Sequence, residues 1–212
     1  CDTYADRTAE LAKTVKDKKG KDIYETTDYK DLLTRHDIDA LVICTAWESH
    51  TEIAVASMRA GIPVAMEVGG TYTVEDCFLL VKTQRETGTK FMLLENCCYG
   101  RAELTVLNMV KQGLFGDVVH CEGGYQHDLR DEIGEGDKTG HYRQRNFMHR
   151  NGELYPTHEL GPICEYLSIN RGNRMVSLVA MSSKAAGLHE WLEANRPDSP
   201  LAKAQVNQGD SM

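Results

Sequence analysis

The stretch that decides the fold is Ala40-Leu-Val-Ile-Cys-Thr45, a continuous apolar run. Such a run is typical of a strand in a parallel sheet that is covered on both faces. Similar runs follow at residues 63–68 and 91–96, and amphipathic segments separate them. Strands that alternate with helices over short links predict βαβ units with right-handed crossovers. The first half of the chain is therefore predicted to be a parallel α/β sheet.

The helices of this half have recognisable ends. We expect them over residues 2–18, 28–33, 49–61, 73–88 and 101–112, with a weak strand at 23–25. Ser49-His-Thr-Glu52 and Thr73-Val-Glu-Asp76 both fit a capping box, which marks a helix start. Glycines at positions 20, 61, 88 and 113 mark helix ends.

The second half of the chain does not continue this regular alternation of strands and helices. It predicts a long strand at 118–127, a polar loop at 130–151, a helix at 158–169, a strand at 175–181 and a helix at 185–194. We interpret residues 1–114 as a dinucleotide-binding domain. Residues 115–212 are interpreted as part of an α+β substrate and oligomerisation domain with an open sheet.

Both ends look cut. A dinucleotide-binding sheet needs a first strand and a glycine-rich turn, and the sequence contains no GxGxxG. Asp2 stands before a helix, where a ribose-binding acid is found about 20 residues after that turn. We therefore expect the first βα unit to lie upstream, and the chain to be an internal fragment that by itself binds its dinucleotide poorly.

Composition excludes several classes of protein. The 212 residues carry 24 basic and 32 acidic side chains, a net charge of −8, with 7% aromatic residues, which argues against nucleic-acid binding. The longest apolar stretch, Ala40 to Trp47, is too short to span a membrane, and no signal peptide is visible. The seven cysteines form no CxxC pair or zinc-like spacing, so we expect buried free thiols, a reducing compartment and no metal site.

Ligands of such sheets collect at the carboxyl ends of the strands. The residues at these ends are Asp2, Thr45 to His50, Glu67, Val68, Glu95 and Asn96. Asp2 suits ribose hydroxyls or a helix cap. Trp47 and His50 suit a nicotinamide or adenine ring, or an ordinary surface loop. Glu67 and Asn96 are individually weak candidates, and the four ends together point to one ligand-binding edge.

The second half supplies candidate substrate groups. Tyr125 and His127 share one face of a predicted strand. Arg143 or Arg145 would clamp a polar or anionic group. Tyr155-Pro-Thr-His158 places a histidine at a predicted helix start, where the positive end of the helix dipole keeps the imidazole neutral. The plain alternative for each is a surface residue or a satisfied core histidine.

These motifs resemble those of the Gfo/Idh/MocA oxidoreductases and, more closely, glycoside hydrolase family 109, the NAD-dependent α-N-acetylgalactosaminidase type. The resemblance covers nearly the whole chain. It rests on Leu94-Glu-Asn-Cys-Cys-Tyr99, Gln112-Gly-Leu-Phe-Gly116, His149-Arg-Asn-Gly-Glu-Leu-Tyr-Pro-Thr-His158, Asn170-Arg-Gly-Asn-Arg174 and Ser182-Ser-Lys-Ala185. It departs from the family pattern at Glu48-Ser49-His50, usually Glu-Trp-His, and at Glu67-Val68-Gly69, usually Glu-Lys-Pro.

The resemblance implies a role for each candidate residue. Asp2, Trp47, Glu48, Ser49, His50, Glu67, Val68 and Asn96 would line NAD. Tyr125, Arg143, Tyr155, Pro156, Thr157 and His158 would meet the sugar, with Tyr155 and His158 as acid–base groups in an order left open. Val68 replaces the lysine with which sugar dehydrogenases move a proton.

The implied reaction is redox-neutral hydrolysis of an α-N-acetylgalactosaminide. Hydride leaves carbon 3 of the sugar, a base removes the carbon 2 proton, the aglycone departs, water adds and the hydride returns. The alternatives are a net NAD(P)-dependent sugar or cyclitol dehydrogenase and a non-catalytic fragment. The implied partner is a small glycoside, without nucleic acid or a membrane span, and the second domain would form a homo-oligomer.

Overall fold

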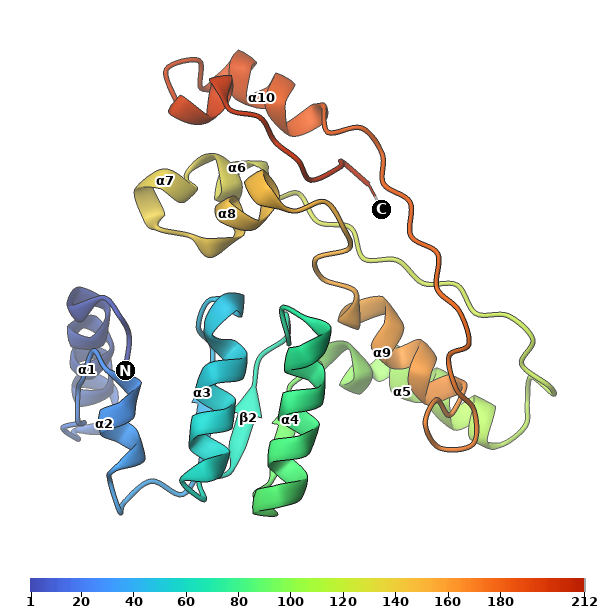
Figure 1. Cartoon of the computed structure of the whole chain (residues 1–212), viewed down its shortest axis with the longest axis horizontal. Coiled ribbons are helices and arrows are strands. Elements are labelled where there is room, and N and C mark those ends of the chain that lie inside the picture. The colour runs from blue at the N-terminus through green and yellow to red at the C-terminus, as the bar shows by residue number, and fades with distance from the viewer. Residues whose placement is uncertain (212) are drawn as a thin grey trace. The chain divides into compact units, whose positions relative to one another are not determined.

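The computed structural model describes residues 1–211 (Figure 1). It divides the chain into two compact units, Cys1–Leu94 and a second unit that begins at Glu95. The predicted domain boundary at residues 114 and 115 stays a proposal. Across residues 1–211, every helix is too short or too polar to cross a lipid bilayer.

The first unit is built on a parallel sheet of three short strands. They are β1 (Leu41–Ile43), β2 (Val64–Met66) and β3 (Phe91–Leu93), in the order β1-β2-β3. Leu41 is paired with Val64, and Val64 with Phe91, so the first residues of the three strands are in register. This confirms the parallel α/β sheet that the apolar runs predict.

Two crossover helices cover one face of the sheet. α3 (Trp47–Arg59) links β1 to β2, and α4 (Val74–Thr87) links β2 to β3. Crossovers between parallel strands are right-handed in nearly all proteins, and both of these move in the same direction across the sheet. Both helices accordingly lie on the same side, in front of β2 in Figure 1. Ile43, Met58 and Met66 form the centre of the core between them, each at most 1% exposed.

The other face of the sheet is open. Val42 is 61% exposed and Met92 is 46% exposed. The prediction that the 40–45 run is covered on both faces is therefore wrong for the described residues. Side chains alternate between the faces of a strand, and residues 41–93 supply helices to one face only.

The two predicted capping boxes have different outcomes. At α4 the box is present, because Thr73 Oγ1 accepts the Asp76 N–H at 3.1 Å and Asp76 Oδ2 accepts the Thr73 N–H at 3.1 Å. At Ser49 the prediction is wrong, since α3 already begins at Trp47. Ser49 lies inside the first turn, and its hydroxyl donates to the Ala46 carbonyl at 2.8 Å.

Two further helices precede the sheet. α1 (Ala5–Lys19) ends at Gly20, whose φ of 67° gives a left-handed cap, and α2 (Tyr29–Leu33) is capped by Asp28. Both agree with the predicted helices to within a few residues. The weak strand predicted at 23–25 does not form.

The regular elements of the second unit are all helices, and irregular segments connect them. Its elements are η1 (Asn96–Tyr99), α5 (Arg101–Lys111), α6 (Arg130–Gly134), α7 (Gly136–Thr139), α8 (Tyr142–His149), α9 (Thr157–Tyr166), α10 (Gly187–Asn195) and η2 (Pro200–Lys203). The helices predicted at 158–169 and 185–194 are confirmed as α9 and α10. The predicted 130–151 loop is wrong, because it folds into α6, α7 and α8. Tertiary packing overrides its polar composition, with Ile133 only 2% exposed and Asn146 fully buried.

The strands predicted at 118–127 and 175–181 are also wrong. Within residues 95–211 these segments pair with no strand, and Val119, Val176 and Val179 are 92%, 85% and 87% exposed. A β-branched run becomes a strand only where a neighbouring strand completes its hydrogen bonds.

The cysteines are all free, as expected, but the prediction that they are buried is wrong. Cys1, Cys44 and Cys77 are exposed, and the other four are partly exposed.

A tight contact fixes the turn that follows β2. Gly69 has φ of 98°, and a Cβ there would lie 2.0 Å from the Trp47 indole. Trp47 is only 4% exposed, so its ring fills the space beside the glycine. The neighbouring Gly70 has φ of 52° and open space where a Cβ would be.

Gly69→Ala should therefore destabilise the fold by roughly 2–4 kcal/mol, because it adds a steric overlap to backbone strain. Gly70→Ala is the matched control and should cost only about 1 kcal/mol, since it adds strain alone. Urea unfolding followed by tryptophan fluorescence measures both. Equal losses for the two variants would show that the Trp47 contact does not constrain this turn.

His50 is buried, and a second proton on its imidazole ring, at Nδ1, would have no hydrogen-bond acceptor. It is 1% exposed, its Nε2 donates to the Thr45 carbonyl at 3.0 Å, and Nδ1 has no hydrogen-bond partner. Burial lowers the pKa of His50, and this outweighs the hydrogen bond to Thr45 and the charges of Glu67 and Glu48. The neutral imidazole is the form that fits the core.

His50 should make stability fall at acid pH. Its pKa is lower in the folded than in the unfolded chain, so stability is intact above the unfolded value near 6.5 and is lost as the pH falls toward the folded value. The thermal midpoint of the wild type should drop more between about pH 8 and about pH 5 than that of His50→Gln. The exposed His36→Gln is the control, and a drop in His50→Gln equal to that of the wild type would refute the assignment.

Candidate active site

A buried carboxylate, Glu95, anchors a cluster of polar and aromatic side chains in the second unit. Glu95 is the N-cap of η1, and its Oε1 accepts the Cys97 N–H at 2.9 Å. The residue is only 6% exposed. The short 3₁₀ helix therefore holds the carboxylate in one orientation below the surface.

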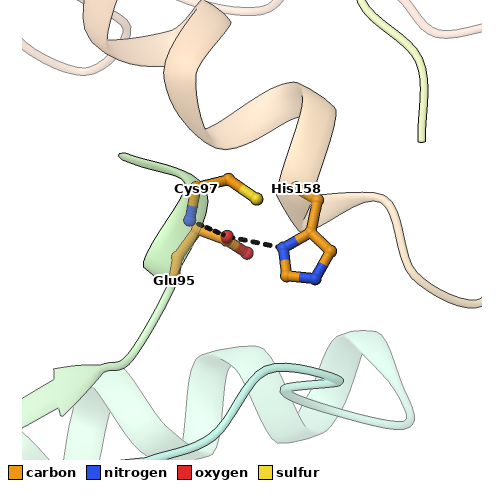
Figure 2. A group of neighbouring side chains, drawn as sticks. All are labelled: Glu95, Cys97 and His158. Carbon is orange, nitrogen blue, oxygen red and sulfur yellow. Dashed lines mark hydrogen bonds and ion pairs between the residues drawn. The ribbon is translucent and has the colours of Figure 1, made fainter. Parts of the chain in front are cut away.

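His158, in the first turn of α9, pairs with this carboxylate. The Nδ1–Oε1 distance is 2.6 Å and His158 is 8% exposed. An ionised carboxylate can only accept, so Nδ1 carries the shared proton and Nε2 is left as an acceptor. Figure 2 shows Nδ1 facing Glu95 and the second ring nitrogen pointing away from it. The pair thus presents an oriented imidazole that can take a proton at Nε2.

A glycine lets α9 approach Glu95 closely. Gly161 lies three residues after His158, and a Cβ there would come within 3.0 Å of Glu95 Cγ and 2.8 Å of Cys98 Sγ. Residues three apart share a helix face. The missing side chain therefore brings the His158 side of α9 against η1, with which α9 is in extensive contact.

The electrostatics favour an ionised Glu95. Burial raises the pKa of this carboxyl, but the nearby Thr157 hydroxyl, His158 and the Cys97 N–H together outweigh burial and hold the pKa below its usual value. Burial and then the Glu95 charge raise the pKa of the Cys97 thiol. The second carboxylate oxygen, Oε2, is buried and has no hydrogen-bond partner. Glu95 therefore carries a buried negative charge that is only partly compensated.

Two tyrosines pack edge-on against His158. The ring centroids of Tyr125 and Tyr155 lie 4.5 and 4.4 Å from that of His158, and 5.7 Å from each other. His127 lies 5.7 Å from Tyr125. The structure thus brings together four of the side chains that the sequence singles out. Phenol and imidazole groups are among the side chains that donate and accept protons in catalysis.

Arg143 borders this cluster from α8. Its guanidinium lies 5.3 Å from the Tyr155 ring centre, and Nη1 forms an ion pair of 2.9 Å with Glu132. Arg145, the alternative, is exposed. Pro156 is the N-cap of α9 and Thr157 its first residue. The buried Thr157 hydroxyl lies near the Glu95 carboxylate but forms no well-aligned hydrogen bond. Arg143 is thus the arginine placed beside the aromatic cluster.

The predicted cofactor residues of the first unit follow β1 and β2. Because these strands are parallel and in register, Thr45 to His50 and Glu67 to Val68 emerge at the same edge of the sheet. Glu48 is exposed, while Asp2, Ser49 and Glu67 are partly exposed. This edge fits a dinucleotide, since strand ends of this kind bind one and these polar groups remain accessible.

Several of these residues have structural contacts of their own. Three of these residues are buried in the core beneath this edge, with 4%, 1% and 4% exposure: Trp47, His50 and Val68. Asp2 accepts the Tyr4 N–H at 2.9 Å, and α1 begins only at Ala5. In the second unit, Asn96 is exposed and opens η1, where the sequence predicts a strand end.

Sequence reasoning undervalued Glu95, which it treats only as a strand-end residue. Its partner His158 is 63 residues away, and no spacing rule links the two. The available signal was a carboxylate after a strand together with a histidine at a helix start. Among residues 1–211, Glu95, Cys97 and His158 also form a group whose potential metal-ligating atoms all lie within 4.8 Å of one another.

Comparison with known proteins agrees with this division. Residues 2–94 match the model of the oxidoreductase family with an NAD-binding Rossmann fold, and residues 99–212 match the C-terminal domain of glycosyl hydrolase 109. A solved NAD-binding protein from Listeria innocua has a TM-score of 0.48 and 27% identity, covering 61% of this chain and 37% of its own.

Two curated relatives extend the match. A glycosyl hydrolase family 109 protein from Solibacter usitatus is 39% identical, over 99% of this chain and 50% of its own length. An alpha-N-acetylgalactosaminidase from Bacteroides fragilis is 44% identical, over 86% of this chain and 44% of its own. The chain spans about half the length of these relatives. With the C-terminal family model matched from residue 99 onward, the chain belongs to glycosyl hydrolase family 109.

Proposed function

We propose that this protein is an NAD-dependent, redox-neutral glycosidase that acts on α-N-acetylgalactosaminides. The observation that carries the proposal is the Glu95–His158 pair surrounded by Tyr125 and Tyr155. Membership of family 109 and the name of the Bacteroides fragilis relative support the substrate class. The Rossmann match of residues 2–94 supports a nicotinamide cofactor, and we propose NAD.

The cofactor, when bound, supplies reversible hydride acceptance from carbon 3 of the sugar. The chain must then hold and move protons. His158 accepts a proton at Nε2, and the Glu95 carboxylate stabilises the resulting imidazolium through the 2.6 Å bond at Nδ1. Tyr125 and Tyr155 offer phenol groups for the second proton transfer. A ketone at carbon 3 acidifies the carbon 2 proton, so imidazole and phenol groups suffice without a pair of carboxyl groups beside the glycosidic oxygen.

A buried aliphatic residue argues against net oxidation. Val68 occupies the position at which sugar dehydrogenases of this fold carry a lysine, and it is 4% exposed. An isopropyl group neither accepts nor donates a proton. The hydride is therefore proposed to return to the sugar in the same catalytic cycle, and NADH does not leave as a product.

The direct test uses p-nitrophenyl α-N-acetylgalactosaminide and the purified protein, with and without added NAD. Nitrophenol release and NADH absorbance are recorded together. We expect nitrophenol to accumulate without NADH, because the hydride is returned. Steady NADH formation from free sugars without nitrophenol would identify a net dehydrogenase and overturn the proposal.

The Glu95–His158 pair should behave as one catalytic unit. Glu95→Gln and His158→Asn should each lower kcat by roughly 100- to 10,000-fold, because the first loses the charge that stabilises the imidazolium and the second loses the base. The double variant should lose little more than the worse single variant, since both changes disable the same proton transfer. KM and NAD affinity should change much less than kcat.

Two measurements keep this prediction specific. His36→Asn, an exposed histidine in the first unit, is the matched control and should retain full activity. Thermal unfolding of each variant separates loss of fold from loss of chemistry. Losses that add in the double variant would mean that the two residues act independently, contrary to the proposed mechanism.

A further inference from the structure

Three side chains around the proposed base form a mixed set of metal ligands. The potential ligand atoms of Glu95, Cys97 and His158 all lie within 4.8 Å of one another. Glu95 and His158 are buried and Cys97 is partly buried. Figure 2 shows the Cys97 sulfur on the same side as the imidazole, with the Glu95 carboxylate beside both.

The chemistry of the set suits zinc. Zinc binds thiolate sulfur at about 2.3 Å, imidazole nitrogen at about 2.0–2.1 Å and carboxylate oxygen at about 2.0–2.2 Å. In a tetrahedron these bond lengths separate neighbouring ligand atoms by about 3.3–3.6 Å. Atoms already within 4.8 Å would have to approach one another by at most about 1.5 Å to reach that geometry. Three protein ligands would leave the fourth position open.

A second observation points to a missing cation. Glu95 is 6% exposed, yet its Oε2 has no hydrogen-bond partner. The Thr157 hydroxyl is near enough to lower the pKa of Glu95 but forms no well-aligned hydrogen bond with Oε2. A buried carboxylate oxygen that lacks a well-aligned donor is costly in free energy. A metal ion between the carboxylate, the thiol and the imidazole would satisfy that oxygen.

We propose that Glu95, Cys97 and His158 bind one zinc ion, and that the bound ion excludes the proton-transfer function of His158. Zinc takes the Nδ1 lone pair, so the imidazole proton moves from Nδ1 to Nε2. The Cys97 thiol releases its proton to solvent as it becomes a ligand. His158 then has no lone pair with which to accept a proton. The inhibition rests on the proposed function, whereas the zinc binding does not.

Binding is tested on chelator-treated, reduced protein by calorimetric titration with zinc. The wild type should bind one ion per chain at this site, and Cys97→Ser should bind it at least about tenfold more weakly, because a serine hydroxyl is a poor zinc ligand. Cys98→Ser is the matched control and should keep wild-type affinity. Cobalt should give a thiolate charge-transfer absorption in the wild type and Cys98→Ser that is missing in Cys97→Ser.

The contradicting outcomes are distinct. Equal zinc affinity in Cys97→Ser and the wild type, in variants with the same thermal unfolding, would overturn the site, as would no binding at all. Where the glycosidase assay is active, zinc should inhibit the wild type reversibly, with recovery on chelation. Cys97→Ser should need at least about tenfold more zinc for the same inhibition. Zinc bound through Cys97 without loss of activity would overturn the exclusion of proton transfer.

Discussion

The 2.6 Å hydrogen bond between His158 Nδ1 and Glu95 Oε1 is the interaction on which the proposed chemistry depends. Both partners are buried, so solvent cannot replace either one cheaply. The carboxylate sets the tautomer of the imidazole and thereby directs Nε2 as the proton acceptor. Gly161 permits the approach of α9 on which this bond relies. A local 3₁₀ turn and one missing side chain thus set the geometry around the imidazole that we propose as the base.

The rest of the described structure supports the two parts of the proposed site separately. In the first unit, the parallel strands present their carboxyl ends at one edge, and buried Trp47, His50 and Val68 form the support beneath it. In the second unit, the tyrosines surround His158. Glu95 and His158, to which we assign proton transfer, are together with Cys97 the proposed zinc ligands. Under the two proposals, proton transfer by His158 and zinc binding exclude each other.

Sequence reasoning succeeded where the signal is local. Apolar runs located β1, β2 and β3, and the Thr73–Asp76 box located the start of α4, because burial and capping act over a few residues. Ser49 failed as a cap because Ala46 already takes that position. The helices within 130–151 were missed because part of their packing is distant in sequence: α6 contacts α10, and Gly134 lies against Trp191 and Leu192. The motif singled out Tyr155 and His158, whose rings lie together in the structure. The pairing of Glu95 with His158 joins residues 63 apart in sequence, which no local pattern predicts.

The central claim is that a base in this site removes the carbon 2 proton of the sugar. Hydrolysis of an α-N-acetylgalactosaminide in heavy water, followed by NMR of the released sugar, measures that step directly. The account predicts deuterium at carbon 2 of the product, since the proton taken by the protein exchanges with solvent before one is returned. A product that keeps its original hydrogen at carbon 2 would contradict the elimination mechanism and the role given to His158 and Glu95.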